Sequence, residues 1–490
     1  MLIKYGWAII AVCILVACSE HASLGQTQAT PPASTTGDNS FQADPAAQRQ
    51  AQNRRTVVQR LTQEMRDLIP TDYTGNTAKL KALDTISDLF ISGDTAAVTS
   101  GLESLAKADP DFPPADLVKA GLHYAANDIQ GGGQLLEKLA IAEPDNPAVF
   151  IAFSRLAFSQ NRISDALALC EKAESKMDVA KLSAVSQKFL QTQIADSMTT
   201  ITAKQRRFAA AEKHADQWQA LAPGSVRMLL TRAELKFLQD DIPSAMKYLN
   251  QLRQVEPKSR PPEIILASWY LRKRDDTGVE KWIKEAIGKY PENAIANLEY
   301  ANWALSKEDF KTSSSAIAKY ESIGEVNSSS KLLRARIAFA RQQYPVAAGL
   351  LDELFKTRPG SFDVSNLYVL SLIESANKER QKLAAQIAQR NFQALPNNAV
   401  AAAAYGWVLL KQGATADASK LLLQTAKSAE LPPEVTFFVA SMLEANGQNA
   451  QAQTLLKPAL QTKGLFLYRQ RAKELYQRLG SSELPAPTNK

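Results

Sequence analysis

Prolines recur along this chain at one fixed interval, and that interval constrains the fold more than any other feature of the sequence. Each closes an apolar stretch with helical spacing. The steps from Pro110 to Pro144, from Pro223 to Pro257 and from Pro257 to Pro291 are equal, and the step from Pro291 to Pro359 is twice as long. A fixed interval predicts internal repeats, whose core grows along one axis. A length of 490 residues therefore does not imply about three separate domains.

Small residues keep the same interval inside the apolar stretches. One series with this spacing is Ala233, Ala267, Ala301 and Ala335, and it is accompanied by a series of turn residues at Asp241, Asp275, Asp309 and Gln343. Near the C-terminus, the small residues Gly406, Gly413 and Ala418 are followed one interval later by Ala440, Gly447 and Ala452. Small side chains let neighbouring helices approach closely, and glycine supports a turn between them.

A 34-residue unit of helix, turn and helix with these small residues and a closing proline resembles the tetratricopeptide repeat (TPR). The resemblance implies an all-α solenoid of about eleven degenerate helical hairpins over residues 54–480. Amphipathic segments at 54–68 and 465–479 are expected to cap its two ends. Because the step from Asp178 to Pro223 is longer than the repeat interval, we also expect an extra helical segment at about 186–204.

The first residues are typical of an export signal rather than of the folded body. Lys4 precedes an apolar run that is too short to span a membrane, and the run ends in Leu15-Val16-Ala17-Cys18. This ending resembles the bacterial lipobox, which implies a signal peptide over 1–17 and a lipid, including palmitate, on Cys18. The alternative is an ordinary secretory signal cleaved after Ala17. Ser19, in place of Asp, favours the outer membrane over the inner membrane.

Two segments have compositions that favour disorder. Residues 18–53 are rich in Ala, Ser, Thr, Gln and Pro and have few large apolar side chains, so we expect a tether behind the lipidated Cys18. Residues 481–490 are expected to form a disordered tail. A flexible tether of about 35 residues reaches roughly 30 Å, which would hold the folded body away from the lipid headgroups.

Catalytic and metal-binding signatures are scarce. The chain has three Cys and three His, and His123 and His214 lie on separate predicted helices without a paired-ligand spacing. Cys170 occupies an apolar contact position, where a thiol acts as a small hydrophobe. Residues 131–133 are three glycines without a preceding strand or a following GKS or GKT, which predicts a helix–helix turn rather than a phosphate loop. We therefore expect no enzyme activity, no cofactor and no metal.

The charge pattern argues against a nucleic-acid partner. The formal net charge is +7, and residues 203–290 alone carry 17 basic against 11 acidic side chains. Basic runs such as residues 272–274 are followed directly by acidic residues, which is typical of mixed, solvated helix faces rather than a phosphate track. We expect no nucleic-acid binding, although an anionic-ligand patch stays an alternative.

The TPR resemblance implies that the first helices of successive repeats line a groove that binds a partner. The residues predicted at this groove are Glu234, Asn302, Arg336 and Trp407. The row is chemically mixed, and ordinary packing between helices is the alternative explanation. Only Asn302 matches the carboxylate clamp of chaperone-binding TPR domains, so chaperone tails are not expected as ligands.

These expectations combine into one functional hypothesis. The resemblance to bacterial TPR lipoproteins implies a non-enzymatic scaffold, anchored by lipid in the cell envelope and facing the periplasm, that binds a protein partner. Envelope assembly or exopolysaccharide secretion is the expected setting. The alternative is a glycan-binding outer-membrane lipoprotein for nutrient uptake, but such proteins have aromatic-rich insertions, whereas here aromatic residues make up 7% and the repeats run nearly uninterrupted.

Overall fold

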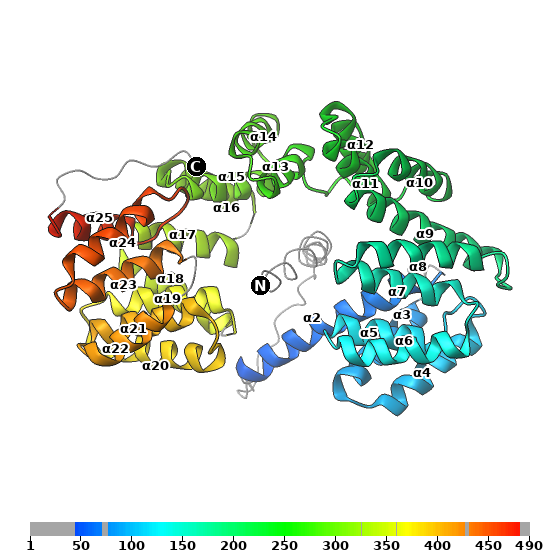
Figure 1. Cartoon of the computed structure of the whole chain (residues 1–490), viewed down its shortest axis with the longest axis horizontal. Helices are drawn as coiled ribbons and strands as arrows, with labels where there is room; N and C mark the ends of the chain where they lie inside the picture. Colours follow the sequence, from blue (N-terminus) through cyan, green and yellow to red (C-terminus); the bar gives the residue numbers. More distant parts are fainter. Residues whose placement is uncertain (1–44, 71–76, 325, 359, 427–430, 481–490) are drawn as a thin grey trace, which may run out of the picture. The chain divides into compact units, whose positions relative to one another are not determined.

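The computed structural model describes residues 45–70, 77–324, 326–358, 360–426 and 431–480. It has 24 helices, and within these ranges there is no strand. The chain divides into two compact units, residues 1–256 and residues 257–490, and each is described by itself. The helices of both units are drawn in Figure 1.

The helices of the first unit are α2 (Pro45–Leu68), α3 (Thr77–Ser92), α4 (Thr95–Ala108), α5 (Ala115–Ala125), α6 (Ile129–Ala142), α7 (Pro147–Ser159), α8 (Ile163–Lys176), α9 (Ala184–Lys204), α10 (Phe208–Leu221), α11 (Val226–Leu238) and α12 (Ile242–Val255). The helices of the second unit are α13 (Pro262–Arg272), α14 (Asp276–Lys289), α15 (Ala294–Ser306), α16 (Phe310–Ile323), α17 (Ser328–Ala340), α18 (Tyr344–Thr357), α19 (Phe362–Ile373), α20 (Lys378–Ala394), α21 (Ala399–Lys411), α22 (Thr415–Thr425), α23 (Pro433–Ala445), α24 (Asn449–Gln461) and α25 (Arg469–Arg478).

Consecutive helices pair into hairpins. From α3 onward each odd-numbered helix, here called an A helix, packs along the even-numbered B helix that follows it, up to α23 with α24. Five hairpins belong to the first unit and six to the second, with α2 before the first hairpin and α25 after the last. The predicted all-α fold of about eleven TPR-type hairpins is confirmed.

The turns of ten of the eleven hairpins repeat one backbone conformation, and the α19–α20 turn is the exception. Residues with positive φ recur in these turns, mostly at the repeat interval, at Gly93, Asn127, Asn161, Arg206, Asp240, Arg274, Glu308, Gln342, Gly413 and Gly447. A residue with a Cβ enters this left-handed region only at a cost, so the hairpin geometry imposes it. The degenerate repeats thus keep the turn while losing the glycine that fits it best.

The predicted turn residues act as helix N-caps. The carboxylates of Asp241, Asp275 and Asp309 accept hydrogen bonds from backbone N–H groups three residues later, at 3.1, 2.9 and 3.0 Å. Each bond satisfies a donor that the first turn of a helix leaves free. Gln343 caps α18 without such a side-chain bond. The Asp series therefore lies at the end of each turn, where it starts the B helix.

The small residues lie where the helices approach most closely. The four alanines Ala233, Ala267, Ala301 and Ala335 are all buried. At Gly406 a Cβ would come within 2.8 Å of Leu422 Cγ on the paired helix, so a larger residue would force the two helices apart. Close packing at these positions is what preserves the repeat register in both units.

The helical segment expected at about 186–204 lies in α9, which the additional residues before Pro223 lengthen to 21 residues. Two other features differ from expectation. The helix α2 begins at Pro45, so residues 45–53, assigned above to the tether, are helical; their alanines and glutamines favour a helix. The glycines at 131–133 lie in the first turn of α6, where Gly132 packs against the Tyr124 ring, so the predicted turn was wrong by a few residues.

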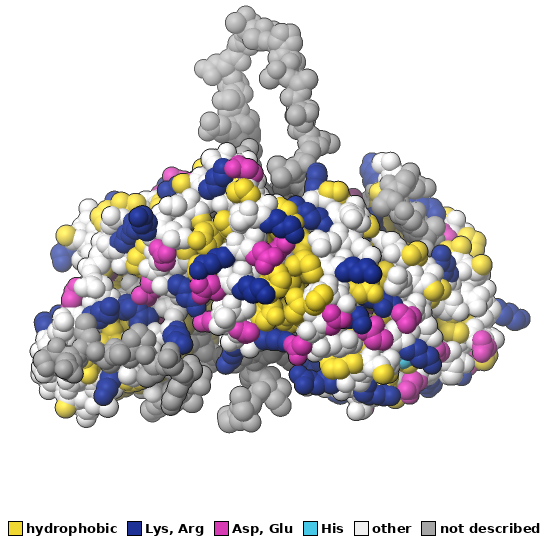
Figure 2. All heavy atoms as spheres, turned by 90° about the horizontal axis from the view of Figure 1, so that it is seen from above, with side chains coloured by type: hydrophobic (Ala, Val, Ile, Leu, Met, Phe, Trp, Pro, Cys, Tyr) yellow, Lys and Arg dark blue, Asp and Glu magenta, His cyan; other side chains and the backbone are white. Residues whose placement is uncertain are grey.

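The surface carries both signs of charge. Figure 2 shows Lys and Arg side chains interspersed with Asp and Glu on the face it presents. Many of them form ion pairs between neighbouring helices, such as Lys307 with Asp276 at 2.7 Å and Lys331 with Glu353 at 2.6 Å. None of the described helices is long and apolar enough to cross a membrane.

Candidate functional site

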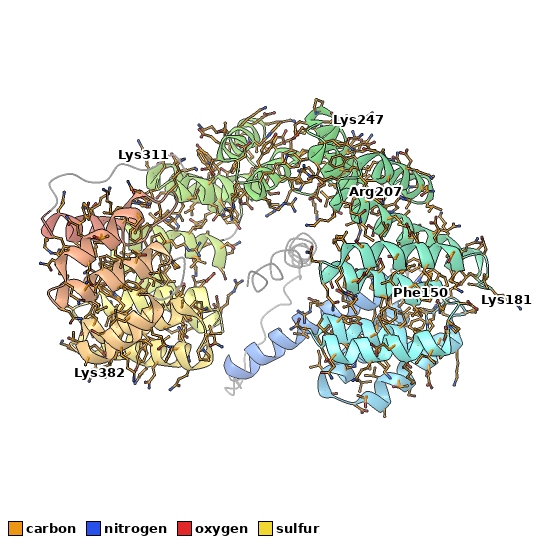
Figure 3. All side chains as sticks on the ribbon, viewed as in Figure 1. Phe150, Lys181, Arg207, Lys247, Lys311 and Lys382 are labelled. Carbon is orange, nitrogen blue, oxygen red and sulfur yellow. The ribbon has the colours of Figure 1, made fainter. Side chains whose placement is uncertain are left out.

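The A helices form the inner side of each unit. Besides the contacts between consecutive helices, contacts recur between one A helix and the next. In the first unit they join α7 to α9 and α9 to α11. In the second unit they join α15 to α17, α17 to α19, α19 to α21 and α21 to α23. The B helices present exposed basic side chains at the margin of the ribbon, as Lys247 of α12 and Lys382 of α20 illustrate in Figure 3. Each unit therefore has one concave face, lined by A helices.

The four residues predicted at the partner groove all lie on A helices. Glu234 belongs to α11 in the first unit, whereas Asn302, Arg336 and Trp407 belong to α15, α17 and α21 in the second. Asn302 is exposed and its amide donates to the Leu298 carbonyl. Glu234 and Arg336 are half-buried, and Trp407 is buried. Their role in binding stays a prediction, and Cys18 lies outside the described residues.

The second concave face is covered by the end of the chain. This C-terminal segment, residues 465–478, runs from α24 back across the A helices as far as α15. Its Phe466 and Tyr468 side chains are only 2% and 1% exposed. The Tyr468 ring lies 5.1 Å from Phe339, 5.0 Å from Phe437, 5.2 Å from Phe438 and 5.9 Å from Trp407, measured between ring centroids.

Three glutamates from different hairpins hold the C-terminal segment. Glu308 Oε1 accepts hydrogen bonds from the Phe466 backbone N–H at 3.0 Å and from Arg469 Nε at 2.7 Å. Glu434 Oε1 accepts the Leu467 backbone N–H at 3.0 Å. Two of these bonds go to backbone groups of a stretch that belongs to no helix, so the glutamates bind main chain as well as side chain.

The third glutamate, Glu374, lies at the centre of this arrangement. Its side chain is 4% exposed and forms ion pairs with Arg471 of the C-terminal segment and with Lys411 of α21. It also accepts hydrogen bonds from Trp407 Nε1 at 3.1 Å and the Tyr468 hydroxyl at 3.2 Å. Four donors around one buried carboxylate keep its charge compensated.

Burial shifts several pKa values here. It raises the pKa of Tyr468 well above the usual value, and it raises the pKa of Glu434. For Arg471, burial alone would lower the pKa, but the adjacent Glu374 carboxylate and the neighbouring tyrosines outweigh it and the net shift is upward. The Arg471 guanidinium is therefore held charged against Glu374.

The first concave face is polar instead. Asp196 of α9 has a side chain only 7% exposed; its Oδ2 pairs with Arg227 Nη2 of α11 at 2.8 Å. Its other oxygen, Oδ1, is buried and has no hydrogen-bond partner among the described residues, and the same holds for Gln193 Oε1, one turn earlier on α9. A buried acceptor without a donor is costly, so this face has unused hydrogen-bonding capacity.

Arg155 of α7 adds a cation to the same face. Desolvation lowers its pKa, with nearby Arg227 acting in the same direction and Asp196, Asp67 and Glu64 opposing it. Burial also raises the pKa of Glu64, on α2. The four A-helix residues Arg155, Gln193, Asp196 and Arg227 together are called the polar cluster below. They combine two cations, one carboxylate and unfilled acceptor positions, which suits a ligand with both N–H and C=O groups.

Other candidate groups have structural partners. Cys170 is buried and burial raises its pKa to about 12, so the thiol is held neutral inside the hairpin. His123 Nδ1 lies 2.7 Å from Asp128 Oδ2, and His214 Nδ1 lies 3.1 Å from Gln217 Oε1. Within the described ranges, no group of three or more His, Cys, Asp or Glu side chains could hold a metal ion.

Both faces contain residues that the sequence patterns did not single out. Glu308, Glu374 and Glu434 do not share one position of the repeat, so periodicity does not mark them. The stretch Leu465-Phe466-Leu467-Tyr468-Arg469 does carry a signal, since it concentrates aromatic and basic residues at a terminal cap. In the polar cluster, Asp196 and Gln193 stand in α9, the one lengthened A helix of the first unit.

Comparisons with known proteins show likeness at the level of the fold. No protein-family model and no curated protein matches the chain. Among solved structures, a tetratricopeptide repeat protein from Parabacteroides merdae is 12% identical over 52% of this chain and 99% of its own, with a TM-score of 0.39. The P58(IPK) TPR domain is 16% identical over 77% of this chain and 98% of its own, with a TM-score of 0.25. The APC/C hetero-tetramer Cut9-Hcn1 is 11% identical over 89% of this chain and 95% of its own, with a TM-score of 0.34.

Proposed function

We propose that this chain is a lipid-anchored scaffold that faces the periplasm and uses a concave A-helix face to bind a protein partner in an envelope-assembly or exopolysaccharide-secretion system. The repeat architecture supports protein binding in general, because stacked hairpins offer an extended concave surface and no recognisable catalytic arrangement among the described residues. The envelope setting is supported by the sequence of residues 1–18.

The observation that carries the proposal is the polar cluster of the first concave face. Asp196 Oδ1 and Gln193 Oε1 are buried acceptors without a donor in the described part of the chain, and Arg155 is a desolvated cation beside them. A peptide segment laid along α7, α9 and α11 would supply N–H groups to the acceptors and C=O groups to the guanidinium. Bonds of that kind are worth most where both partners are already desolvated.

A pull-down tests partner binding. The tagged chain is purified from detergent-solubilised envelopes as wild type, as Arg155→Ala and as Arg162→Ala. Arg162 is the matched control, because it pairs with Asp165 at the start of a B helix and not on the concave face. We expect Arg155→Ala alone to lose a specific protein, with the melting temperature unchanged. Equal recovery by all three forms contradicts the proposal for this face, and recovery of a polysaccharide without a protein would favour the glycan-binding alternative.

The anchor is tested separately. Cys18→Ser is expected to move the protein from the membrane fraction to the soluble fraction, because acyl burial contributes about 0.8 kcal/mol per CH₂. Wild-type protein should incorporate radiolabelled palmitate and the variant should not. Membrane fractionation of Cys18→Ser like that of the wild type would contradict lipid anchoring while leaving partner binding open to the pull-down.

A further inference from the structure

The C-terminal segment is bound as a peptide ligand would be bound. Residues 462–468 form no helix, and the backbone N–H groups of Phe466 and Leu467 donate to glutamates of two other hairpins, α15–α16 and α23–α24. A capping helix ordinarily packs through an apolar side alone. Here, side chains of the concave face also accept hydrogen bonds from the main chain of an irregular stretch. Hydrogen bonds to main chain, combined with pockets for side chains, are the way a protein surface binds a peptide segment.

We infer that the second concave face is a binding site for a peptide segment that turns into a helix and carries aromatic and arginine side chains, that residues 465–471 occupy it in cis, and that a partner segment of the same chemistry takes their place. This inference rests on the proposed protein-binding function but names a different face and the chemistry of its ligand.

Aromatic side chains define one half of the specificity. Tyr468 is enclosed by Phe339, Trp407, Phe437 and Phe438, and its hydroxyl reaches Glu374. Phe466 is buried two residues earlier, so the site takes two rings at i and i+2. The backbone turns between them and the helix, since the Arg469 N–H donates to the Phe466 carbonyl at 2.9 Å and α25 begins at Arg469.

Charge defines the other half. Arg469 pairs with Glu308 and Arg471 pairs with Glu374, which also pairs with Lys411. If the segment left without a replacement, Glu374 would keep a single cation. The four rings that enclose Tyr468, called the aromatic floor below, would then face water. Both changes are unfavourable, so the occupant is exchanged for a ligand with arginines and rings rather than simply released.

The connection of the segment permits exchange. It follows the last hairpin, so its departure breaks no hairpin, and it is joined to α24 through residues 462–464, where Gly464 has φ of +98°. Three hydrogen bonds belong to the resident segment alone: Arg469 also donates to the carbonyls of Leu460, Thr462 and Gly464 at 2.9 to 3.0 Å. Removing the two groove-facing arginines therefore weakens the resident segment and leaves the floor intact.

A labelled peptide tests the inference without an envelope partner. A fluorescein-labelled peptide of residues 462–478 is titrated by anisotropy against the full chain as wild type, as Arg469→Ala/Arg471→Ala and as Arg478→Ala. Arg478 is the matched control on the same helix, since it pairs with Glu444 and does not touch the aromatic floor. We expect the double variant to bind the peptide at least tenfold more tightly than the other two. A peptide with Glu at both arginine positions should not bind.

Equal weak binding by all three forms, with helix content retained by circular dichroism, would overturn the inference and leave the segment as a cap. If the double variant unfolds, hydrogen exchange on the wild type gives the answer. A large excess of peptide should speed hydrogen exchange at the Phe466 and Leu467 amides. Unchanged protection would overturn the inference that a partner replaces the segment. Light scattering measures whether the occupant is a second copy of this chain. A dimer that the peptide does not dissociate would mean that C-terminal segments swap between copies, and it would overturn the inference of a separate partner. A negative pull-down with a positive peptide titration would contradict the first face only.

Discussion

The two units share one hairpin design but differ in what lies on their concave faces. The second face has an aromatic floor and a buried carboxylate, and the chain covers both with its own C-terminal segment. The first face has charged and amide side chains, and the described residues leave two of its buried acceptors unfilled. Apolar surface is stabilised by being covered, whereas a polar cluster gains most when a ligand completes its hydrogen bonds. The repeat therefore sets the shape of a face, and the side chains on the A helices set whether it is filled.

The largest effect is expected from Tyr468→Ala. Removing a fully enclosed ring leaves a cavity among four aromatic side chains, and such changes cost about 3–5 kcal/mol. Chemical denaturation should show this loss, and hydrogen exchange should show lost protection in the second unit only. Tyr468→Phe, which removes just the hydroxyl, should cost about 1 kcal/mol. Equal loss of protection in the first unit would break the comparison.

A second prediction contrasts a buried ion pair with an exposed one in the second unit. Glu374→Ala leaves Arg471 partly buried without its carboxylate and is expected to lower the free energy of unfolding by about 3–5 kcal/mol. Glu444→Ala removes the exposed pair with Arg478 and should cost about 1 kcal/mol or less. Urea denaturation of both variants measures the difference. Similar costs would mean that Glu374 does not organise the second face.

The corresponding change in the first unit should affect stability much less. Asp196→Ala removes one pair to an Arg227 side chain that is 61% exposed, together with a buried oxygen that has no donor among the described residues, so the two effects partly cancel. We expect a change in unfolding free energy of about 1 kcal/mol or less, with loss of the partner in the pull-down. A cost as large as that of Glu374→Ala would show that the first face is also structural.

Turn conformation should not distinguish the units. Arg206 in the first unit and Gln342 in the second have φ of 59° and 60°. Replacing either by glycine relieves the left-handed strain and is expected to raise stability by about 0.5–1 kcal/mol, the gain being reduced by the greater freedom of glycine in the unfolded chain. Gln205→Gly is the control, because its φ is −76° and no gain is expected. Thermal melts of the three variants would measure the gain.

The smallest effects concern pH and have opposite signs in the two units. A hydrogen bond from Arg334 lowers the pKa of Glu321, so Glu321 stabilises the fold above the ordinary glutamate pKa and this contribution is lost as the pH falls through its folded value. Burial raises the pKa of Glu64, so its ionisation opposes folding at neutral pH, and the penalty disappears in acid. Glu321→Gln should lower, and Glu64→Gln should raise, the urea midpoint at pH 7, and both differences should shrink as the pH falls, that of Glu64 first.

Most of the repeat architecture could be predicted from the sequence, because each hairpin depends on residues within one repeat unit. The Ala267 and Ala301 contacts, the Asp241 cap and the Gly413 turn are local, and each leaves a periodic mark. The packing of the C-terminal segment on the second face could not be predicted. Phe466 contacts Glu308 across 158 residues, and no periodic series in the sequence links these two positions. Trp407 was placed correctly on an A helix, but its burial depends on Tyr468, which no pattern links to it.

The position of the C-terminal segment has a consequence while the chain folds. It is the last described part of the chain to emerge into the compartment where the chain folds, and each hairpin can form against its predecessor before it arrives. Until then the floor around Trp407 and Phe437 stays open, with Glu374 opposite Lys411 alone. For that interval the newly made second unit is a receptor without its resident occupant. A chain truncated after α24 would remain in that state, with an exposed apolar aromatic surface that favours association with neighbouring proteins.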